Sequence, residues 1–501
     1  MLIMGPLRKL EPDGPKGDRA EIRAKGCNGC GGRASEQAAW LYSEHVMTVA
    51  FRLAEFLVAN RTTELPPQTL DHAAMLIAST FASAACGIGL ESSRIIRELA
   101  QERGGRPDGT LWFTGRKLPV TDVAQVNAVM SDAAASDDSD LRNIVHAGTP
   151  LTAASLAIAE HKGASGEAVL TAMVLGYEAA GRISAAITPG FRERGFHGCL
   201  GAIFAAAVAS GLLMRLDATQ LAHAIALSAT SIGGLAIAAD TSVAREYHAG
   251  LAASLGVNAA LAASRGYRAE LAILETRRGF FESFGGVDGR AAATAALHDL
   301  GSNWDIVTDM AIKLVPGGHP YHALAEAAAS AARSGKIAAD DIESITISRP
   351  GMTALNGPLH PVDLIDMAHS PAYFTAAGAA DGTFSWQHAS ATKIADPVIH
   401  RLIDLVRVGA PPVEDAALFR QGAKVTIRAL DGREATGTVY LPKGAGALGI
   451  AWSDVDAKYR ALVPRSGVSA RAVEASLGLI HEFRQASQVA RLVGLLQVGG
   501  A

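Results

Sequence analysis

The sequence predicts a mainly α-helical protein with a smaller α+β domain. Between residues 121 and 265, apolar residues recur at i, i+3 and i+4 through a series of segments separated by Gly, Pro or Asp, which is typical of packed helices. After residue 310, IESITISRP alternates like a strand, and AKVTIRALDGREATGTVYLP has the pattern of a hairpin that turns at Asp431-Gly432. From residue 451 the periodicity is helical again.

These patterns divide the chain into four segments. Residues 1–45 are polar, Gly-rich and aperiodic, and we expect a flexible N-terminal extension. Residues 46–310 form the first part of a large all-helical domain, which starts with two helices on either side of TTELPPQ. Residues 311–450 form an α+β lid domain, with a helix predicted over DPVIHRLIDLVRVG. Residues 451–501 have apolar faces that need a partner, so we expect them to return to the helical domain and close it.

Length and composition indicate a large buried core. The chain has 501 residues, of which 49% are hydrophobic and 19% charged, so it can fold into more than one globular domain. Aromatic residues make up only 5%, whereas there are 52 glycines, so burial must come mostly from Ala, Leu, Val and Ile. Small residues let helices approach closely, and we expect tight helix packing that extends into a subunit interface.

Charge and hydropathy exclude several classes of protein. The net charge is −4 and the isoelectric point about 6.4, and there is no basic stripe of the kind that neutralises phosphates, so we expect no nucleic-acid partner. No apolar run approaches the ~20 residues of a membrane span, and the N-terminal residues lack a signal-peptide core. We therefore expect a soluble, cytoplasmic protein. GxGxxG and GxxxxGK[ST] are absent, which disfavours a nucleotide cofactor.

The four cysteines predict neither a disulfide framework nor a metal site. Cys27 and Cys30 have CxxC spacing in CNGCGG, but no second pair of ligands lies nearby, so we interpret the pair as incidental. Cys86 and Cys199 are isolated in the sequence. No HExxH motif or other clear three-ligand set is present, and we predict no metal.

Four groups of polar residues lie at the boundaries of predicted helices. They are SDDSDLRNIVHAGTP with Asp137, Asp138, Asp140 and His146; RGFHG with His197; TSVAREYHAG with Arg245, Tyr247 and His248; and IKLVPGGHPYH with Lys313, His319, Tyr321 and His322. Each group has an ordinary structural interpretation, because acids cap helices and a buried His can be satisfied by its neighbours.

The groups also have functional interpretations. His146 precedes a helix whose N-terminal amides favour a carboxylate, and Arg245 can bind a carboxylate with two N–H groups. Lys313 and His319 lie where the helical domain passes into the α+β domain, and small-molecule sites often occupy such clefts. His, Lys and Arg without a cofactor suit the binding of a small polycarboxylate and the movement of a proton next to it.

Taken in order, the segments resemble the MmgE/PrpD family over about residues 47–495. The resemblance rests on the shared order of LAEFLVANRTTELPPQTLDHA, HAGTPLTAASLAIAE, GYEAAGRI, RGFHGCLGAIFAAA, REYHAGLAAS, GFFESFGG, KLVPGGHPYHALAEAA and SPAYFTAAGAADGTF. Members include 2-methylcitrate dehydratase, cis-aconitate decarboxylase and iminodisuccinate epimerase. The resemblance implies a helical domain with an α+β lid, a homodimer, a pocket between the two domains, and activity on a small polycarboxylate with no metal or nucleotide cofactor.

The same resemblance implies catalytic roles for His146, His197 and Lys313, which match the histidine of the usual His-Pro-Gly, the Phe-His histidine and the lysine that opens the lid segment. Arg245 stands where the decarboxylases have a lysine, and His319 is displaced by one position relative to the decarboxylase pattern. An arginine donates a proton poorly because its pKa exceeds ~12, but it can still hold a carboxylate.

Two serines also depart from the lyase pattern. Ser136 and Ser139 fall where lyase-type members tend to have acids, and only Asp137 and Asp138 remain nearby. These departures favour a reaction that only removes and returns a proton, and hence an epimerase of the iminodisuccinate type. We expect Arg245, His319, Asp138 and Tyr247 to bind substrate. A dehydratase or decarboxylase, and a non-catalytic dimeric binding protein, remain the alternatives.

Overall fold

The computed structural model describes residues 48–231 and 233–498, and the predicted extension with Cys27 and Cys30 lies outside these residues. The polypeptide from residue 45 on forms one compact unit. Two hydrophobic cores run through this unit, one helical and one built on a sheet. The predicted fold class, mainly α with a smaller α+β part, is confirmed.

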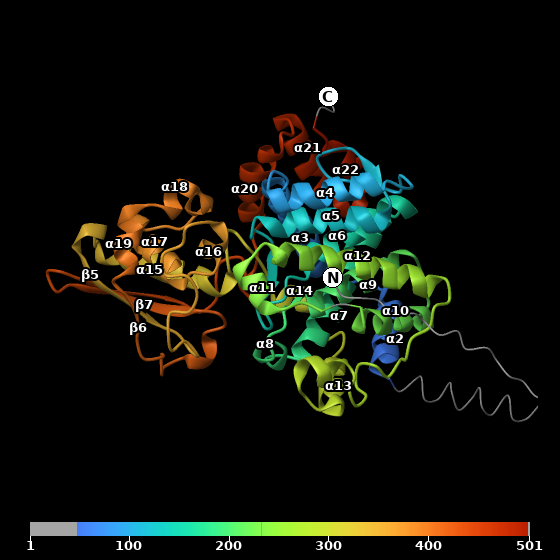
Figure 1. Ribbon diagram of the computed structural model, residues 1–501, viewed down its shortest axis with the longest axis horizontal. Coiled ribbons are helices and arrows are strands. Elements are labelled where there is room, and N and C mark those ends of the chain that lie inside the picture. Colours follow the sequence, from blue (N-terminus) through green and yellow to red (C-terminus); the bar gives the residue numbers. More distant parts are fainter. Residues whose placement is uncertain (1–47, 232, 499–501) are drawn as a thin grey trace, which may run out of the picture. The chain divides into compact units, whose positions relative to one another are not determined.

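The first core is built from helices that surround α9, whose fifteen residues are all buried (Figure 1). Its longer helices are α2 (Val49–Asn60), α3 (Pro67–Gly87), α4 (Glu91–Arg103), α5 (Val120–Ala133), α6 (Gly148–Lys162), α7 (Gly166–Ala186), α9 (Cys199–Leu213), α10 (Ala218–Ala229), α12 (Ala244–Ser264) and α13 (Gly289–Leu297). Shorter helices are α8 (Gly190–Glu193), α11 (Ala236–Thr241) and α14 (Asp305–Thr308). The two helices predicted around TTELPPQ are α2 and α3.

Small residues bring these helices close together, as the composition predicts. A Cβ added at Gly256 of α12 would lie 2.7 Å from the Cβ of Ala206 on α9, closer than real Cβ contacts allow. At Gly176 of α7, the same addition would lie 2.8 Å from the carbonyl oxygen of Ala205. The Ala- and Gly-rich faces therefore set the separation between α9 and its neighbours.

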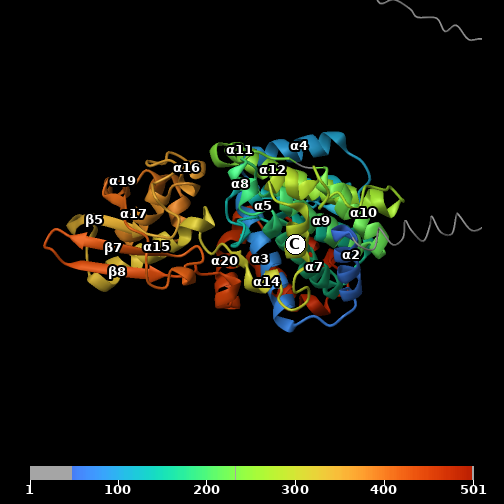
Figure 2. The same cartoon turned by 90° about the horizontal axis from the view of Figure 1, so that it is seen from below.

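The second core packs helices against a four-stranded sheet of order β6-β5-β7-β8. The strands are β5 (Ile342–Ser348), β6 (Val406–Val408), β7 (Ala423–Ala429) and β8 (Glu434–Val439). The helices are α15 (His319–Gly335), α16 (Leu364–Ala368), α17 (Pro371–Asp381), α18 (Ala391–Ile394) and α19 (Pro397–Ile403). Figures 1 and 2 show α15 and α17 against the sheet. The hairpin predicted at Asp431-Gly432 is confirmed by the β7–β8 pairing.

The helix predicted over residues 396–409 is wrong in its second half. Helix α19 ends at Ile403, and residues 406–408 form β6, which pairs in parallel with β5. Only Val406 of the three strand residues is fully buried, so the strand is held by its pairing rather than by a clear alternation of its own. A three-residue strand leaves too little pattern to be told from the end of a helix.

The helical part also contains short strands that the periodicity does not reveal. β1 (Gly109–Thr110) pairs with β2 (Lys117–Leu118), and β3 (Asp138–Asp140) pairs with β4 (Met310–Ile312). The second pair joins segments about 170 residues apart, and Met310 and Ile312 pack in the first core rather than with the lid sheet. The helical part is therefore not purely α-helical.

The C-terminal residues return to the helical part, as predicted. They form α20 (Trp452–Leu462), α21 (Ala470–His481) and α22 (Ala490–Leu495), and their apolar residues belong to the first core. Both α20 and α21 contact α3. The pairing of these amphipathic faces with α3 buries the apolar surface that the sequence left without a partner.

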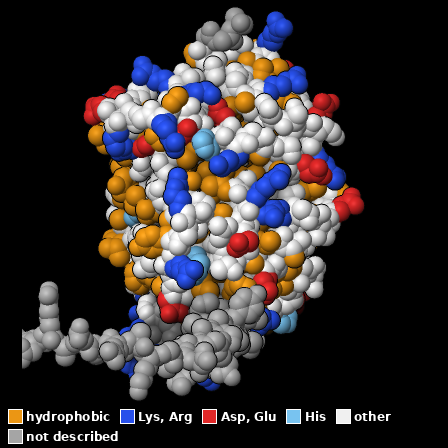
Figure 3. All heavy atoms as spheres, turned by 90° about the vertical axis from the view of Figure 1, so that its right-hand side faces the viewer, with side chains coloured by type: hydrophobic (Ala, Val, Ile, Leu, Met, Phe, Trp, Pro, Cys, Tyr) orange, Lys and Arg blue, Asp and Glu red, His pale blue; other side chains and the backbone are white. Residues whose placement is uncertain are grey.

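No single helix among the described residues has the length and apolar character needed to cross a membrane; α3 and α4 pass that test only as a pair bent by 95°. Figure 3 shows one face of the molecule, on which hydrophobic side chains lie between side chains of both charges. Charge of one sign is therefore not gathered on this face.

Candidate functional site

The β3–β4 ladder brings Asp137 opposite Lys313. The antiparallel register pairs Asp138 with Ile312, so the next residues outward are Asp137 and Lys313. The Lys313 N–H donates to the Asp137 carbonyl oxygen at 3.1 Å, and Lys313 Nζ donates to Asp137 Oδ1 at 2.7 Å. Both side chains are 2% exposed. The pairing of two short strands thus creates a buried ion pair between residues that are 176 positions apart.

His146 binds the other oxygen of the same carboxylate. His146 Nδ1 lies 2.7 Å from Asp137 Oδ2, 2.6 Å from the Asp138 carbonyl oxygen and 3.2 Å from Ser139 Oγ. Because a carbonyl and a carboxylate oxygen both face Nδ1, this nitrogen carries the proton in the neutral ring, and Nε2 is left with its lone pair. His146 is therefore oriented as a proton acceptor at Nε2.

Asp137 is anionic in this arrangement. Burial by itself would raise its pKa, but the charges of Lys313 and His146 outweigh burial and hold the pKa of Asp137 well below its usual range. One carboxylate therefore positions two groups that can exchange protons. Asp137 stood in the predicted acidic group, but the sequence alone did not single it out from Asp138.

Asp138 faces the opposite way and holds the start of α6. Its carboxylate oxygens accept the Gly148 N–H at 3.0 and 3.1 Å, and Tyr177 Oη donates to Oδ2 at 3.2 Å. Burial and the charge of Asp137 raise the pKa of Asp138 to about 7. The first helix amide that the sequence suggested for a ligand carboxylate is thus already bound by a side chain of the protein. A direct contact between Asp138 and substrate stays a prediction.

His319, the first residue of α15, is fully buried beside this group. Among the residues that the structure describes, neither Nδ1 nor Nε2 has a hydrogen-bond partner. Burial, followed by electrostatic interaction with His322 and Lys313, keeps the pKa of His319 well below its ordinary value. The ring is neutral at physiological pH. A buried imidazole with two unpartnered nitrogens is a costly feature of a fold and is typical of a ligand-binding position.

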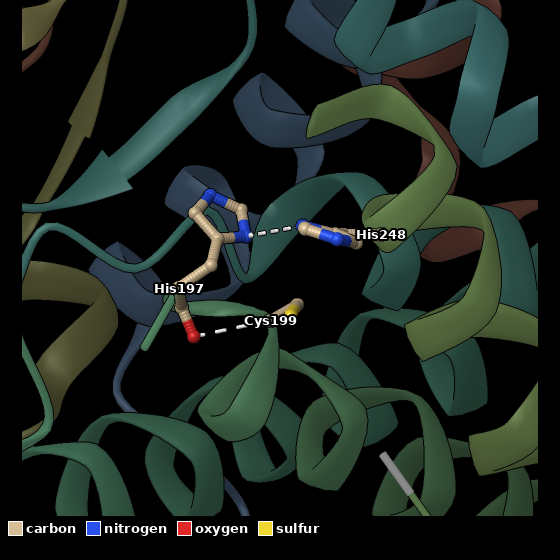
Figure 4. Close-up of side chains that lie close together, drawn as sticks. All are labelled: His197, Cys199 and His248. Carbon is tan, nitrogen blue, oxygen red and sulfur yellow. Dashed lines mark hydrogen bonds between the residues drawn. The ribbon is translucent and has the colours of Figure 1, made fainter. Parts of the chain in front are cut away.

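His197 and Arg245 are carried by other elements of the helical part, His197 just before α9 and Arg245 at the start of α12. His197 lies between α8 and α9, and its N–H donates to the Gly234 carbonyl oxygen at 2.9 Å. Its Nδ1 lies 3.3 Å from Nδ1 of His248 on α12, with Cys199 alongside (Figure 4). Burial and then the charge of His146 hold the pKa of His197 well below its usual range, which places these two histidines within electrostatic reach.

Arg245 is anchored to a buried acid. Its Nε donates to Asp132 Oδ2 at 2.8 Å and its Nη2 to the Asp132 carbonyl oxygen at 2.7 Å. The guanidinium group has five N–H donors, so these two bonds orient it without using it up. Arg245 also lines a cavity of about 210 Å³ whose other walls include Ala135 and His369. Tyr247, two residues further along α12, is 46% exposed.

Lys458 is a buried lysine that no sequence motif indicated. It lies on α20, is 2% exposed, and donates through Nζ to Ser79 Oγ at 2.7 Å and to the Ser136 carbonyl oxygen at 2.5 Å. Nζ also lies 5.4 Å from the centre of the Trp386 ring. Burial lowers the pKa of Lys458 to about 7. Lys458 lies on the apolar stripe of α20, between buried Val455 and Leu462. A lysine within such a stripe is the sequence feature that could have indicated its burial.

Lys458 gives stability a pH dependence that can be measured. Because its pKa falls from 10.5 unfolded to about 7 folded, the unfolded chain binds more protons between these values, and stability rises with pH by up to about 1.4 kcal/mol per pH unit. We expect Lys458→Met to remove this slope in urea unfolding curves recorded between about pH 7 and pH 9. Lys443→Met, at a side chain that is 63% exposed, should keep it. An unchanged slope in Lys458→Met would contradict the prediction.

Most of the predicted site residues therefore lie together. Asp137 joins His146 to Lys313, His319 interacts electrostatically with all three, and His197 and Arg245 interact electrostatically with His146 and Asp137, respectively. None of the contacts described above links Tyr247 to this group. The arrangement offers an imidazole and a lysine on a single carboxylate, with an arginine on a neighbouring element, which suits proton transfer next to a bound anion.

Comparison with known proteins shows the family of the chain. The model of the MmgE/PrpD N-terminal domain matches residues 51–291, and the model of the MmgE/PrpD C-terminal domain matches residues 316–479. The second match extends from the lid into α20 and α21. A search of curated proteins finds no match to the chain. The two family models together cover most of the sequence, in the order expected. The chain belongs to the MmgE/PrpD family, which contains dehydratases, decarboxylases and epimerases.

Proposed function

We propose that this protein is an enzyme that removes a proton from the carbon α to a carboxylate of a small aminopolycarboxylate and returns it, as an epimerase of the iminodisuccinate type. The observation that carries the proposal is the double pairing of Asp137, which lies 2.7 Å from both His146 Nδ1 and Lys313 Nζ. A single carboxylate thereby positions an imidazole and a lysine side chain, which serve in the proposal as base and acid.

The chemistry needs two such groups. An α C–H bond breaks as its proton passes to a neutral imidazole, and the electron pair is delocalised into the adjacent carboxylate. A protonated group on the other face then returns a proton to the same carbon, which inverts its configuration with no net change in composition. His146 Nε2 is the base that the contacts orient, and the Lys313 ammonium is the acid. His197 and His319 are further imidazoles within reach.

Arg245 supports recognition of an anionic substrate. Its guanidinium keeps N–H donors beyond the two that bind Asp132, and these can bind a carboxylate in the adjoining cavity. Asp138 and Tyr247 complete the proposed binding residues. Asp138 acts through the start of α6 and Tyr247 through its exposed ring on α12.

Proton NMR in D₂O tests the reaction. Incubation with one stereoisomer of iminodisuccinate is expected to replace the α-proton by deuterium and to give a second stereoisomer on chiral chromatography, with no other change in mass. Parallel incubations contain a 2-methylcitrate-type hydroxy acid and cis-aconitate. A new vinyl signal without preceding α-exchange, or release of CO₂, would show a lyase instead. The absence of exchange, elimination and decarboxylation with all three would leave the non-catalytic binding protein as the better interpretation.

His319 provides a test that separates stability from function. Both its nitrogens are buried without partners, so His319→Leu is expected to raise the free energy of unfolding at neutral pH by about 1–2 kcal/mol. The same change is expected to reduce turnover. The measurements are urea unfolding and steady-state α-exchange. If His319→Leu lost stability but kept wild-type turnover, His319 would have a structural role in the core and no role in the reaction.

The pH profile of this variant has a definite sign. The pKa of His319 is depressed in the folded state, so below the unfolded value of 6.5 the unfolded chain binds a proton more readily than the folded protein. The free energy of unfolding therefore falls as pH falls from 6.5 towards the folded pKa. Wild-type protein should therefore lose more stability than His319→Leu on acidification below pH 6.5. His298→Leu, at a ring whose side chain is 77% exposed, is the matched control and should resemble wild type.

For the assembly we propose a homodimer. Its support is a group of exposed apolar side chains around α11 and the start of α12, namely Leu235, Ile237, Val243 and Tyr247, which are 46–66% exposed. Light scattering coupled to size-exclusion chromatography measures the mass directly, and a mass near 51.8 kDa would contradict the dimer.

A further inference from the structure

His197, Cys199 and His248 bring three metal-binding atoms together beside the proposed active site. Figure 4 shows the two imidazole rings facing one another, with the Cys199 side chain below them. One nitrogen of each ring and Cys199 Sγ all lie within 4.8 Å of one another. His197 precedes α9, Cys199 is the first residue of α9, and His248 lies in the first turns of α12. The packing of α9 against α12 therefore assembles the group.

The separation of the two imidazole nitrogens is close to that in a tetrahedral site. Nδ1 of His197 and Nδ1 of His248 are 3.3 Å apart. Two nitrogen ligands at roughly 2.0–2.1 Å from a tetrahedral Zn²⁺ are separated by about 3.3 Å. Within residues 48–231 and 233–498, the hydrogen-bond partners of Cys199 Sγ are distant: the carbonyl oxygens of His197 at 3.8 Å and Gly233 at 3.9 Å. The sulfur can turn towards a cation without breaking a strong hydrogen bond.

Gly234 keeps the space around these atoms open. A Cβ at this position would lie 2.5 Å from Cys199 Sγ and 3.3 Å from His248 Nδ1, so any other residue would press on the cluster. The Gly234 carbonyl oxygen accepts the N–H of His197 and fixes the backbone on which that ligand is carried. A residue without a side chain thus borders the cluster where an ion would need room.

We propose that His197, Cys199 and His248 form a binding site for a divalent cation of borderline softness, with Zn²⁺ as its best-suited ion. A thiolate and two imidazoles favour Zn²⁺ over Mg²⁺ or Ca²⁺, which prefer oxygen ligands. Three protein ligands leave a fourth position for water or for an anionic ligand. No motif in the sequence predicts this site, because His197 and His248 are 51 positions apart and meet only in the folded chain.

This inference goes beyond the proposed epimerase activity and does not depend on it. It adds a second role for His197, whose Nδ1 would bind the ion. The metal content is measured without substrate, so a protein that binds Zn²⁺ but fails to exchange α-protons would refute only the proposed function. A protein that exchanges α-protons but takes up no Zn²⁺ here would refute only the metal site.

The experiment uses the full chain with Cys27, Cys30 and Cys86 each changed to serine, which leaves Cys199 as the sole thiol. Co²⁺ is added as a spectroscopic substitute for Zn²⁺. A thiolate-to-cobalt charge-transfer band, together with strong ligand-field bands of tetrahedral Co²⁺, is the expected result, and Zn²⁺ should abolish both. Elemental analysis after gel filtration should find about one Zn²⁺ per chain.

Two single changes in the same background identify the ligands. Cys199→Ser and His248→Ala are each expected to weaken Zn²⁺ binding by more than the roughly 10–100-fold that loss of an outer hydrogen bond causes. His223→Ala, at a histidine on α10 outside the cluster, is the matched control and should keep full binding. Circular dichroism checks that each variant is folded. Absence of the charge-transfer band, or equal Zn²⁺ affinity in His248→Ala and the background, would overturn the site.

Discussion

Lys313→Met is expected to reduce kcat for α-proton exchange by about 10²–10⁴-fold, the range that a general acid or base typically contributes. Methionine has a similar length but neither a charge nor a proton to donate. The change also leaves Asp137 buried with one partner fewer, so the free energy of unfolding should fall by about 3–5 kcal/mol. Both quantities are measured, the first by NMR in D₂O and the second by urea unfolding.

The control separates catalysis from folding. Lys443→Met removes an exposed lysine that pairs with Asp454, and it should alter stability by less than about 0.5 kcal/mol and leave exchange unchanged. Because Lys313→Met is destabilised, its rate is expressed per folded molecule. A folded Lys313→Met enzyme with wild-type kcat would remove Lys313 from the proposed mechanism.

Asp137→Asn is expected to reduce kcat by about 10²–10⁴-fold although Asp137 need not touch substrate. Asparagine has the same shape but no charge, so it orients His146 Nδ1 and Lys313 Nζ poorly and leaves a buried ammonium without its counter-ion. Asp137 is thus a positioning residue. The expected signature is a displaced pH profile of kcat/KM, because the acid and the base both lose the neighbouring negative charge.

A double-mutant cycle tests whether Asp137 acts through Lys313. If it does, Asp137→Asn/Lys313→Met should be little slower than the slower single variant, because groups that act as a unit give non-additive losses. Asp305→Asn is the matched control. Asp305 is also a buried acid, and its ion pair with Arg142, at 2.6 Å, is lost in the variant. It should lower stability but spare exchange. Fully additive losses in the cycle would assign Asp137 and Lys313 independent roles.

Much of the site could be predicted from the sequence because its residues stand at helix boundaries. His146, His197, Arg245 and Lys313 each precede or follow an apolar periodic segment, and polar residues at such places are accessible to a ligand. The order of the segments then predicted the family, which the two family models confirm. The choice between an epimerase and a lyase stays a prediction that the NMR experiment decides.

Other features depend on contacts that no local pattern contains. Asp137 and Asp138 are adjacent and chemically identical, yet strand alternation points one at Lys313 and the other at Gly148. Lys458 enters the site only because α20 packs on α3. The partners that matter, Lys313 for Asp137 and Ser79 for Lys458, lie more than a hundred residues away in the chain. Asp138 differs from Asp137 only in pointing to the opposite face of a short strand. A window of sequence shows neither relation.

Most of the helices, the hairpin and the set of histidine, lysine and arginine residues can be predicted from local patterns, because hydrophobic periodicity and turn residues act locally. Which of these residues lie close enough to interact electrostatically depends on the tertiary structure. The β3–β4 pairing brings Lys313 to Asp137, and the crossing of α9 and α12 brings His248 to His197 and Cys199. Electrostatic interactions depend on distance and burial, and both arise only when remote segments pack together.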